Sequence, residues 1–241
     1  MTEKAEPSAF DEKHPREAWI PHVVPFVGWL FFMQMLGDPA GWKYALRSVI
    51  CLGLFIYMKP WQWYARLNLK NVPAAILAGV AVFFIWIFFE TDFMSRFGMV
   101  HQGYLMVGTQ PPWKLSQPLV EMYYAPETCG WVFAMTRLLG SAFVISFIEE
   151  FFWRGWMYRW ALAENFLKVD LGKFDKVMFF AVAMLFGLIH HRWLVGFLCG
   201  IIYGILIIRT KDIWAGGIAH AVTNLLLGIY VIWAEKYEFW S

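Results

Sequence analysis

Charged residues are scarce in this chain. Lys, Arg, Asp and Glu make up 16% of its 241 residues, whereas 60% are hydrophobic. Soluble domains average about a quarter charged and about half apolar residues, so this composition excludes an ordinary soluble domain. The basic residues form no run, and the formal net charge is only +2. No nucleic-acid partner is therefore expected, and the lipid bilayer is the expected solvent.

Cysteine is scarce as well. Cys51, Cys129 and Cys199 lie far apart, and the first and last of them fall within apolar runs. This spacing predicts neither a disulfide framework nor a thiolate metal cluster. We expect these cysteines to act as small buried hydrophobic residues.

The start of the chain lacks the apolar core of a signal peptide. Residues 1–18 are polar and of mixed charge, and an apolar stretch follows them directly. That stretch is predicted to stay as a first membrane span. We expect residues 1–18 to form a polar cytoplasmic segment and residues 19–241 to form a single transmembrane domain.

Aromatic residues and apolar runs are abundant. Aromatics make up 20% of the chain, and many of the 15 tryptophans stand beside apolar runs, as in the aromatic belts of membrane proteins. Runs that approach the ~20 residues needed to cross the hydrocarbon occur near 20–37, 44–60, 73–90, 131–148, 177–191, 193–208 and 213–233. Segment 91–130 is broken by charges and prolines and is predicted to be a long extramembrane loop, with room for an interfacial helix or an eighth, partial span. The predicted fold is an all-α polytopic membrane helix bundle of about 7–8 transmembrane helices.

Lysine and arginine in short loops indicate the orientation. Basic residues follow the second, fourth and sixth runs, at Lys59, Arg66, Lys70, Arg159, Lys168, Lys173, Lys176, Arg209 and Lys211. These loops and the N-terminus are predicted to be cytoplasmic, which puts segment 91–130 on the far side. Lys43 and Arg47, just after the first run, lie on the wrong side in this scheme.

Three ionisable residues interrupt the hydrophobic stretch that follows the fourth run. If all three side chains (Glu149, Glu150 and Arg154) were left unpaired, the free energy of membrane insertion would rise by on the order of 8 kcal/mol, at roughly 2.5–3.5 kcal/mol for each charge near a helix centre. Glu150 and Arg154 are spaced i, i+4 with the acid first, the favourable order for a helical ion pair. Glu149 is rotated by about 100° from Glu150 on a helix and is left as the unpaired carboxylate.

Two further runs carry polar residues. His190 ends the fifth run, after the small residue Gly187, and His220 and Asn224 are spaced i, i+4 on the seventh. A lone histidine in a membrane helix can simply be an interhelical hydrogen-bonding group. A carboxylate, two imidazoles and an amide on three runs, however, are the residue types of a hydrolytic site.

The residue types suggest the chemistry. Glu149, whose charged form is disfavoured in an apolar environment, could accept a proton from water as a general base. His190 could share that water or protonate the leaving amine. His220 and Asn224 could donate hydrogen bonds to a developing oxyanion. No cofactor is required.

The same residues allow two other chemistries. Glu149, His190 and His220 could form a His2Glu zinc site, but no His-Glu-x-x-His motif is present, so we expect no metal. Ser141 and Ser146 lie on the same run as Glu149, yet no Gly-x-Ser-x-Gly motif accompanies either, which argues against a serine nucleophile.

The motifs resemble those of the CAAX protease and bacteriocin-processing family, which includes the type II CAAX prenyl endopeptidases. Glu149-Glu150-x-x-x-Arg154, Phe186-x-x-x-His190 and His220-x-x-x-Asn224 reproduce, in order, three elements of that family. The chain also resembles a bacterial CAAX-protease-related branch associated with exosortase, or PEP-CTERM, sorting systems. The first ~130 residues carry no motif of the family.

The resemblance implies a metal-independent intramembrane endopeptidase in a bacterial inner membrane, with its catalytic core at about 130–230. Glu149 with His190 would activate water, His220 and Asn224 would form the oxyanion hole, and Glu150 with Arg154 would support the site. The expected substrate is a membrane-associated peptide or protein. A transporter or proton relay and a non-proteolytic scaffold or immunity protein remain as alternatives.

Depth in the membrane raises one difficulty. At about 1.5 Å per residue, Glu149 lies about 15 Å from Arg159 and His220 about 12 Å from Asp212, whereas His190 lies about 21 Å from Lys176. His190 therefore reaches the site only if its helix begins in the cytosol or is tilted.

Overall fold

A computed structural model describes residues 15–37, 40–109 and 122–240, and every regular element in these ranges is helical. Most of the polar segment predicted at 1–18 lies outside the described residues. The long helices are α1 (Pro15–Met35), α2 (Gly41–Met58), α3 (Val72–Phe88), α11 (Trp193–Thr210) and α12 (Ile213–Ala234). A continuous helical stretch, Trp131–Leu162, contains α7 (Trp131–Gly140), α8 (Ser146–Glu150) and α9 (Tyr158–Leu162), and α10 spans Lys176–Leu188.

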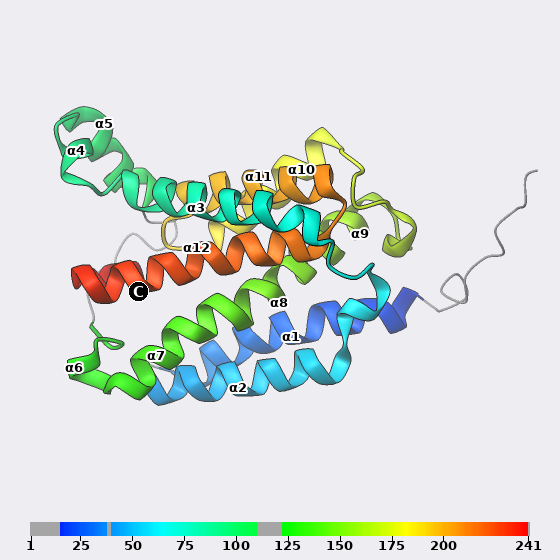
Figure 1. The fold of residues 1–241 in the computed structure, drawn as a ribbon, viewed down its shortest axis with the longest axis horizontal. Coiled ribbons are helices and arrows are strands. Elements are labelled where there is room, and N and C mark those ends of the chain that lie inside the picture. Colours follow the sequence, from blue (N-terminus) through cyan, green and yellow to red (C-terminus); the bar gives the residue numbers. More distant parts are fainter. Residues whose placement is uncertain (1–14, 38–39, 110–121, 241) are drawn as a thin grey trace, which may run out of the picture.

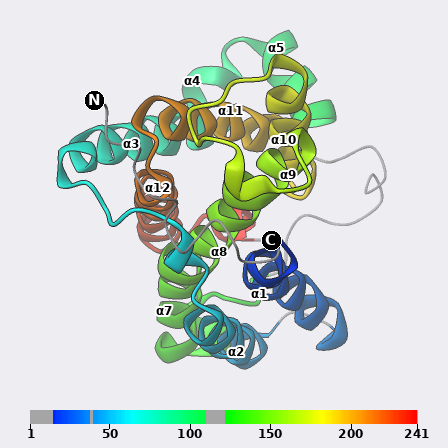
Figure 2. The same cartoon turned by 90° about the vertical axis from the view of Figure 1, so that its right-hand side faces the viewer.

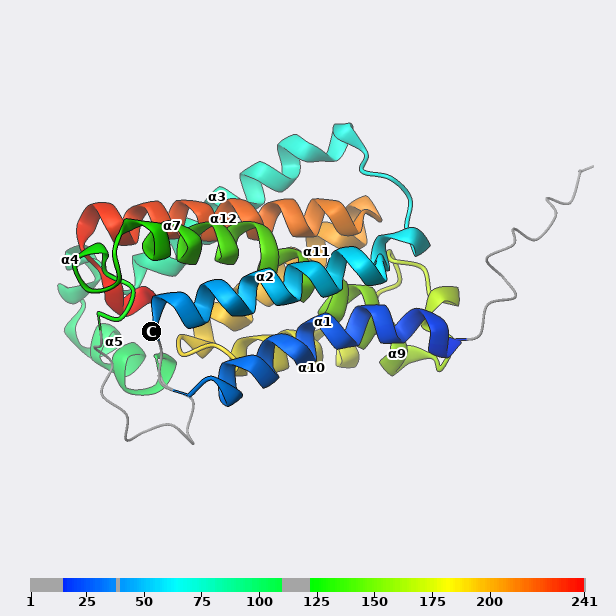
Figure 3. The same ribbon diagram turned by 90° about the horizontal axis from the view of Figure 1, so that it is seen from below.

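The helices form a bundle around the stretch that contains α8. In Figure 1, α1, α2 and α7 lie on one side of the bundle, and α3, α10, α11 and α12 lie on the other. The end-on view in Figure 2 shows α8 near the middle of this arrangement. From below, α1 and α2 form an antiparallel hairpin (Figure 3). Helix α8 therefore packs against both sides of the bundle, including α1 and α12.

Seven helices coincide with the seven predicted apolar runs, but not all are long and apolar enough to span a membrane. Five candidate spans satisfy both conditions in the described part of the chain. Helix α10 has only 13 residues, and α2, which carries Lys43 and Arg47, is not among the five. The all-helical membrane fold is confirmed, whereas the predicted count of 7–8 spans is not.

The fourth helical stretch is longer than the apolar run at 131–148. It continues through the charged residues to Leu162, along the hydrophobic stretch that follows that run in the sequence. Within the described parts of segment 91–130 the helices are short: α4 (Asp92–Ser95), α5 (Gly98–Gly103) and α6 (Pro126–Cys129), together with a π-helical turn, Tyr104–Gly108. Their lengths are far below what a span requires.

The loops with most of the basic residues meet at one end of the bundle, where α1 begins (Figure 1). The Asp212 carboxylate accepts hydrogen bonds from the backbone N–H of Asn68 and the side chain of Asn71, and thus ties the α11–α12 turn to the α2–α3 loop. Lys211 pairs with Asp170 of the α9–α10 loop at 3.0 Å. The gathering of these loops agrees with the predicted topology, and the side of the membrane on which they lie remains a prediction.

Local sequence explains where helices start and how closely they pack. Asp175 and Asp212 cap α10 and α12 by accepting hydrogen bonds from the backbone N–H groups of Met178 and Trp214. Gly187 lets α10 touch the start of α11, because a Cβ there would lie 2.6 Å from the Trp193 carbonyl oxygen. Small residues of this kind allow close helix contact in membranes.

The outer surface of the bundle is apolar. Its exposed large side chains include Val49, Ile56, Leu77, Phe84, Phe143, Val177, Ile205 and Trp233. In water, such a continuous apolar surface would be an association site. Together with the five candidate spans, it marks the chain as an integral membrane protein whose bundle faces lipid.

Replacing Gly187 with alanine should destabilise the α10–α11 contact, because the added methyl group meets backbone atoms that cannot rotate away. We expect a loss of about 1–3 kcal/mol, typical of overpacking. Gly53→Ala in α2 is the matched control, since a Cβ there has no neighbour within 4 Å. Thermal unfolding of the detergent-solubilised protein would measure both, and equal midpoints for the two variants would contradict the close packing.

Candidate active site

Glu149 and Glu150 lie where the long helical stretch departs from regular α-helix. Helix α8 is flanked by two π-helical turns, Ser141–Ile145 and Phe151–Met157. A π-turn shifts the register of side chains and loosens the local hydrogen-bonding ladder, and such turns occur frequently at functional sites. Here the two turns enclose the helical turn that bears both carboxylates.

Glu150 is completely buried and is held by two cationic or hydrogen-bonding groups. Arg154 donates to its Oε1 at 2.9 Å, and His220 Nδ1 lies 3.1 Å from the same oxygen. Arg154 also donates to the carbonyl oxygen of Gly200 at 3.0 Å. The predicted Glu150–Arg154 ion pair is thus present, and it connects the long helical stretch to α11 and α12.

The contact with Glu150 fixes how His220 can be protonated. Because Glu150 Oε1 already accepts from Arg154, the imidazole nitrogen facing it must carry a hydrogen and donate. His220 Nε2 then faces Glu149, with 3.9 Å between Nε2 and Glu149 Oε2. That nitrogen is an acceptor in the neutral ring and a donor in the imidazolium.

Glu149 lines the cavity of the site, whereas Glu150 does not. The Oε2 atoms of both buried carboxylates have no hydrogen-bond partner, but Glu150 Oε1 is held by Arg154 and His220. Glu149 Oε2 and His220 Nε2 therefore face each other at 3.9 Å without a hydrogen bond between them.

His190 does reach this group despite the depth estimate. Helix α10 ends at Leu188, and His190 lies two residues later, with its Nδ1 2.7 Å from the Phe186 carbonyl oxygen. The Phe186 ring contacts both imidazoles, at centroid distances of 4.8 Å to His190 and 5.8 Å to His220. With Nδ1–H donating to the backbone, His190 Nε2 is left as an acceptor in the neutral ring.

Asn224 is anchored by the first π-turn. Its Nδ2 donates to the carbonyl oxygen of Ser141 at 2.8 Å. One turn earlier on α12, His220 stacks on Tyr203, whose hydroxyl donates to Thr223 Oγ1 at 2.7 Å. Thr223 in turn donates to the Gly79 carbonyl oxygen of α3. These bonds hold α12, and with it His220 and Asn224, in a fixed position.

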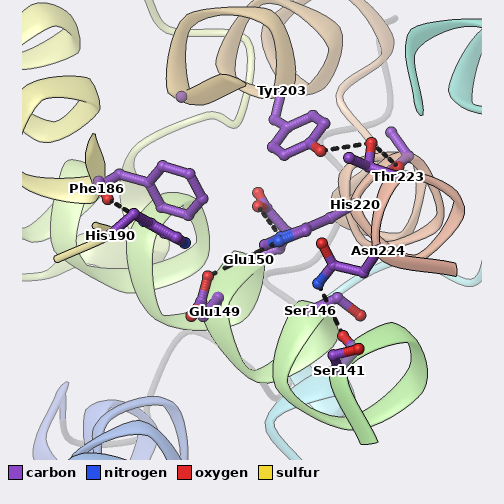
Figure 4. Close-up of polar contacts among 12 residues, drawn as sticks. Ser141, Ser146, Glu149, Glu150, Phe186, His190, Tyr203, His220, Thr223 and Asn224 are labelled. Carbon is purple, nitrogen blue, oxygen red and sulfur yellow. Dashed lines mark hydrogen bonds and ion pairs between the residues drawn. The ribbon is translucent and has the colours of Figure 1, made fainter. Parts of the chain in front are cut away.

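All four predicted residues line one cavity of about 230 Å³. Figure 4 shows Glu149 from α8, His190 from the end of α10, and His220 and Asn224 from α12 around a common space. Much of the remaining lining is aromatic or aliphatic. The cavity can hold a water molecule together with part of a peptide-sized ligand, because one water needs only about 30 Å³.

Several polar residues of the cavity were not predicted from the sequence, among them Tyr203, Arg47 and Arg137. Tyr203 supports His220 by stacking on its ring. The sequence does indicate the two arginines, since both fall inside predicted spans. A charge there is energetically unfavourable and often marks a functional position. Nothing in the sequence distinguishes Tyr203 from the many other aromatic residues.

The geometry of the described residues gives no support to a serine nucleophile or to a metal site. The Ser141 hydroxyl donates to the Leu138 carbonyl oxygen, and that of Ser146 to the Ala142 carbonyl oxygen. Across the residues that the structure describes, no group of three or more His, Cys, Asp or Glu side chains is arranged to hold a metal ion.

Comparison with known proteins finds a family model that matches part of the chain. Residues 131–226 match the family model described as type II CAAX prenyl endopeptidase Rce1-like. No curated protein and no solved structure matches the chain. The match confirms the resemblance stated above, and this family implies peptidase activity on a membrane-associated substrate. The exosortase-associated branch remains a prediction.

The buried ion pair makes a testable contribution to stability. Arg154→Gln should lower the free energy of unfolding by about 3–5 kcal/mol, because it leaves the Glu150 carboxylate buried without its cation. The double variant Glu150→Gln, Arg154→Gln should recover part of that loss. Denaturation in mild detergent would measure both.

The control for this cycle is the exposed pair Lys211–Asp170. Lys211→Gln should cost no more than about 1 kcal/mol, as is usual for surface pairs. If Arg154→Gln were as mild as Lys211→Gln, Glu150 would not be a buried carboxylate that depends on Arg154.

Proposed function

We propose that this chain, whose residues 131–226 match the type II CAAX prenyl endopeptidase family, is a metal-independent intramembrane endopeptidase with Glu149 as general base. The observation that carries the proposal is the cavity in which Glu149, His190, His220 and Asn224 meet. A buried carboxylate oxygen without a hydrogen-bond partner faces this space, and such an oxygen can take a proton from water.

The catalytic water is held between Glu149 and His190. Glu149 supplies a free carboxylate oxygen, and His190 supplies Nε2, because its Nδ1 is bonded to Phe186. A water that donates one hydrogen to each acceptor directs its lone pair toward a peptide carbonyl. Holding it in this geometry removes much of the entropic cost of the attack.

The oxyanion that forms when water attacks is stabilised from α12. His220 Nε2 donates to it in the imidazolium form, and the second hydrogen of the Asn224 amide donates from one turn further along. Glu150 fixes the His220 ring through the contact with Nδ1, and Arg154 fixes Glu150. Preorganised donors of this kind are worth most in a site from which bulk water is excluded.

Glu149 alone can carry out both proton transfers of the reaction, so no further acid or base is needed. Glu149 takes one proton from water as the oxygen bonds to the carbonyl carbon, and the tetrahedral intermediate carries the negative charge on its oxygen. When the carbon–nitrogen bond breaks, the proton on Glu149 passes to the leaving nitrogen. The products are a carboxylic acid and an amine, and Glu149 is again ionised.

The substrate is a peptide or protein that already lies in the membrane. Met33 of α1 and Ile189, just after α10, both line the cavity, and α1 and α10 are separated in the end-on view of Figure 2. An apolar segment entering between these helices would stay in contact with lipid on one side. This route fits a membrane-tethered chain better than a soluble peptide.

Glu149→Gln tests the general base. The change preserves shape and removes the basic oxygen, so we expect a folded protein in which cleavage of a membrane-tethered peptide falls at least about 100-fold. Glu127→Gln, an exposed carboxylate on α6, is the matched control and should cleave at the wild-type rate. Gel analysis of the cleaved peptide in proteoliposomes gives the readout.

Three outcomes would contradict this mechanism. Full cleavage by Glu149→Gln would exclude Glu149 as the base, and loss of wild-type cleavage on treatment with a metal chelator would favour zinc. Complementation of a deletion strain by Glu149→Gln would favour a scaffold over an enzyme.

Asn224→Ala tests the oxyanion site. Removing one donor should lower kcat about 100- to 1,000-fold with little change in KM, because the bond forms only in the transition state. Ser146→Ala is the control, since its buried hydroxyl serves only a backbone carbonyl. Steady-state kinetics would separate the two parameters, and a rise in KM at constant kcat would instead assign Asn224 to substrate binding.

A further inference from the structure

Of the four predicted site residues, all of which the structure describes, His190 alone lies in a turn. Residues 189–192 connect the end of α10 at Leu188 to the start of α11 at Trp193. The backbone N–H of His190 bonds to the Gly187 carbonyl oxygen and its ring to that of Phe186, and both bonds tie it only to the end of α10. Turns are more mobile than helices, so a further contact must hold His190 at the cavity.

Arg192, two residues after His190, ties this turn to the end of α3. Its Nη2 donates to Glu90 Oε2 at 2.8 Å and its Nε donates to Glu90 Oε1. Its Nη1 donates to the Glu238 carbonyl oxygen at 2.9 Å, and its guanidinium lies 4.1 Å from the Phe239 ring centroid. Arg192 is almost completely buried. The paired contact with Glu90 fixes the orientation of both side chains, which a single ion contact does not.

The same end of α3 also touches the His190 ring. Trp86, one turn before Glu90, packs edge-on against the imidazole, with 5.9 Å between the ring centroids and an interplanar angle of 76°. Trp86, His190 and Arg192 all line the cavity. The end of α3 therefore contacts both the ring of His190 and the turn that carries it.

Helix α3 is in turn fixed to the helix that carries His220 and Asn224. Thr223 of α12 donates to the Gly79 carbonyl oxygen of α3 at 2.8 Å. The two helices are in close contact there, because a Cβ at Gly79 would lie 2.5 Å from the Ala219 carbonyl oxygen. Helix α3 is thus a common support for α12 and for the His190 turn.

We infer that Glu90 and Arg192 are positioning residues that hold His190 within reach of the water it shares with Glu149. This inference rests on the proposed peptidase function. The water must lie about 2.6–3.2 Å from each acceptor, and a misplacement of about 1 Å can lower a rate about 100-fold. The pair acts through the turn, and it gives α3, which lies outside the matched residues 131–226, a part in the reaction.

Two rival roles exist for the pair. Arg192 lines the cavity and could contact the substrate directly, but its Nε, Nη1 and Nη2 already donate to Glu90 and Glu238. Those bonds would have to break before the guanidinium could bind an anion. Alternatively, the ion pair only stabilises the fold. The first rival predicts a change in KM, and the second predicts that activity follows stability.

Steady-state cleavage of a membrane-tethered peptide in proteoliposomes tests the positioning role. Glu90→Gln and Arg192→Gln should each lower kcat about 10- to 100-fold with little change in KM, because the turn moves while the cavity stays open. Arg192→Lys keeps the charge without the donor fork, so its kcat should lie between those of the wild type and Arg192→Gln. Lys236→Gln, which removes an exposed ion pair with Glu238, is the matched control and should keep the wild-type kcat.

The Glu90→Gln, Arg192→Gln double variant separates positioning from stability. Each single change leaves a largely buried charge without its partner and should lower the midpoint of thermal unfolding, and the double variant should recover part of that loss. Its kcat should stay as low as that of the single variants. Recovery of kcat together with the midpoint would overturn the inference, because the pair would then only stabilise the fold. A rise in KM at constant kcat would also overturn it and would assign Arg192 to substrate binding.

Histidine NMR gives a readout that does not depend on cleavage. Protein with isotope-labelled histidine in nanodiscs should show one His190 ring signal with the proton on Nδ1, assigned by its absence from His190→Gln. Arg192→Gln should split or broaden this signal and leave the His220 signal unchanged. An unchanged His190 signal would refute the inference. The expected change in a protein whose wild type cleaves nothing would refute the peptidase and retain the positioning of His190.

Discussion

The structure depends on how two adjacent carboxylates are accommodated within a helix bundle in lipid. Glu149 and Glu150 share one helical turn, and only Glu150 is neutralised by its own helix, through Arg154. The other group in contact with the two carboxylates comes from elsewhere in the chain: the His220 imidazole of α12 lies 3.1 Å from Glu150 Oε1 and 3.9 Å from Glu149 Oε2. Helix α12 also packs closely on α8 at Gly217, where an added Cβ would meet the Phe147 ring. The residues that contact the carboxylates and the small residues that allow close packing therefore lie on the same part of α12.

Much of this arrangement could be predicted from the sequence, because it depends on local spacing. The Glu150–Arg154 pair and the common face of His220 and Asn224 follow from i, i+4 periodicity, and the helical segments follow from apolar runs. The inability of Glu149 to share Arg154 equally was also a consequence of helix geometry. In each case the relevant residues lie on one element, so no knowledge of packing is needed.

What the sequence could not provide depends on how elements lie relative to one another. The depth of His190 changes with the length and tilt of α10, and counting residues from Lys176 placed it too far from Glu149. The approach of Arg47 to Arg137 depends on the contact between α2 and α7, and both guanidinium groups lie against the Tyr44 ring. The π-turns around α8 expose the Ser141 carbonyl oxygen to Asn224.

The shortness of α10 has a consequence for the surrounding lipid. Its 13 residues extend about 20 Å, whereas the hydrocarbon of a typical bilayer is about 30 Å thick. Acyl chains next to so short a helix must compress or bend to match it, which is the response to hydrophobic mismatch. Because His190 lies just beyond the end of α10, the thinned membrane would bring headgroups and water closer to the cavity that holds Glu149 than elsewhere around the bundle.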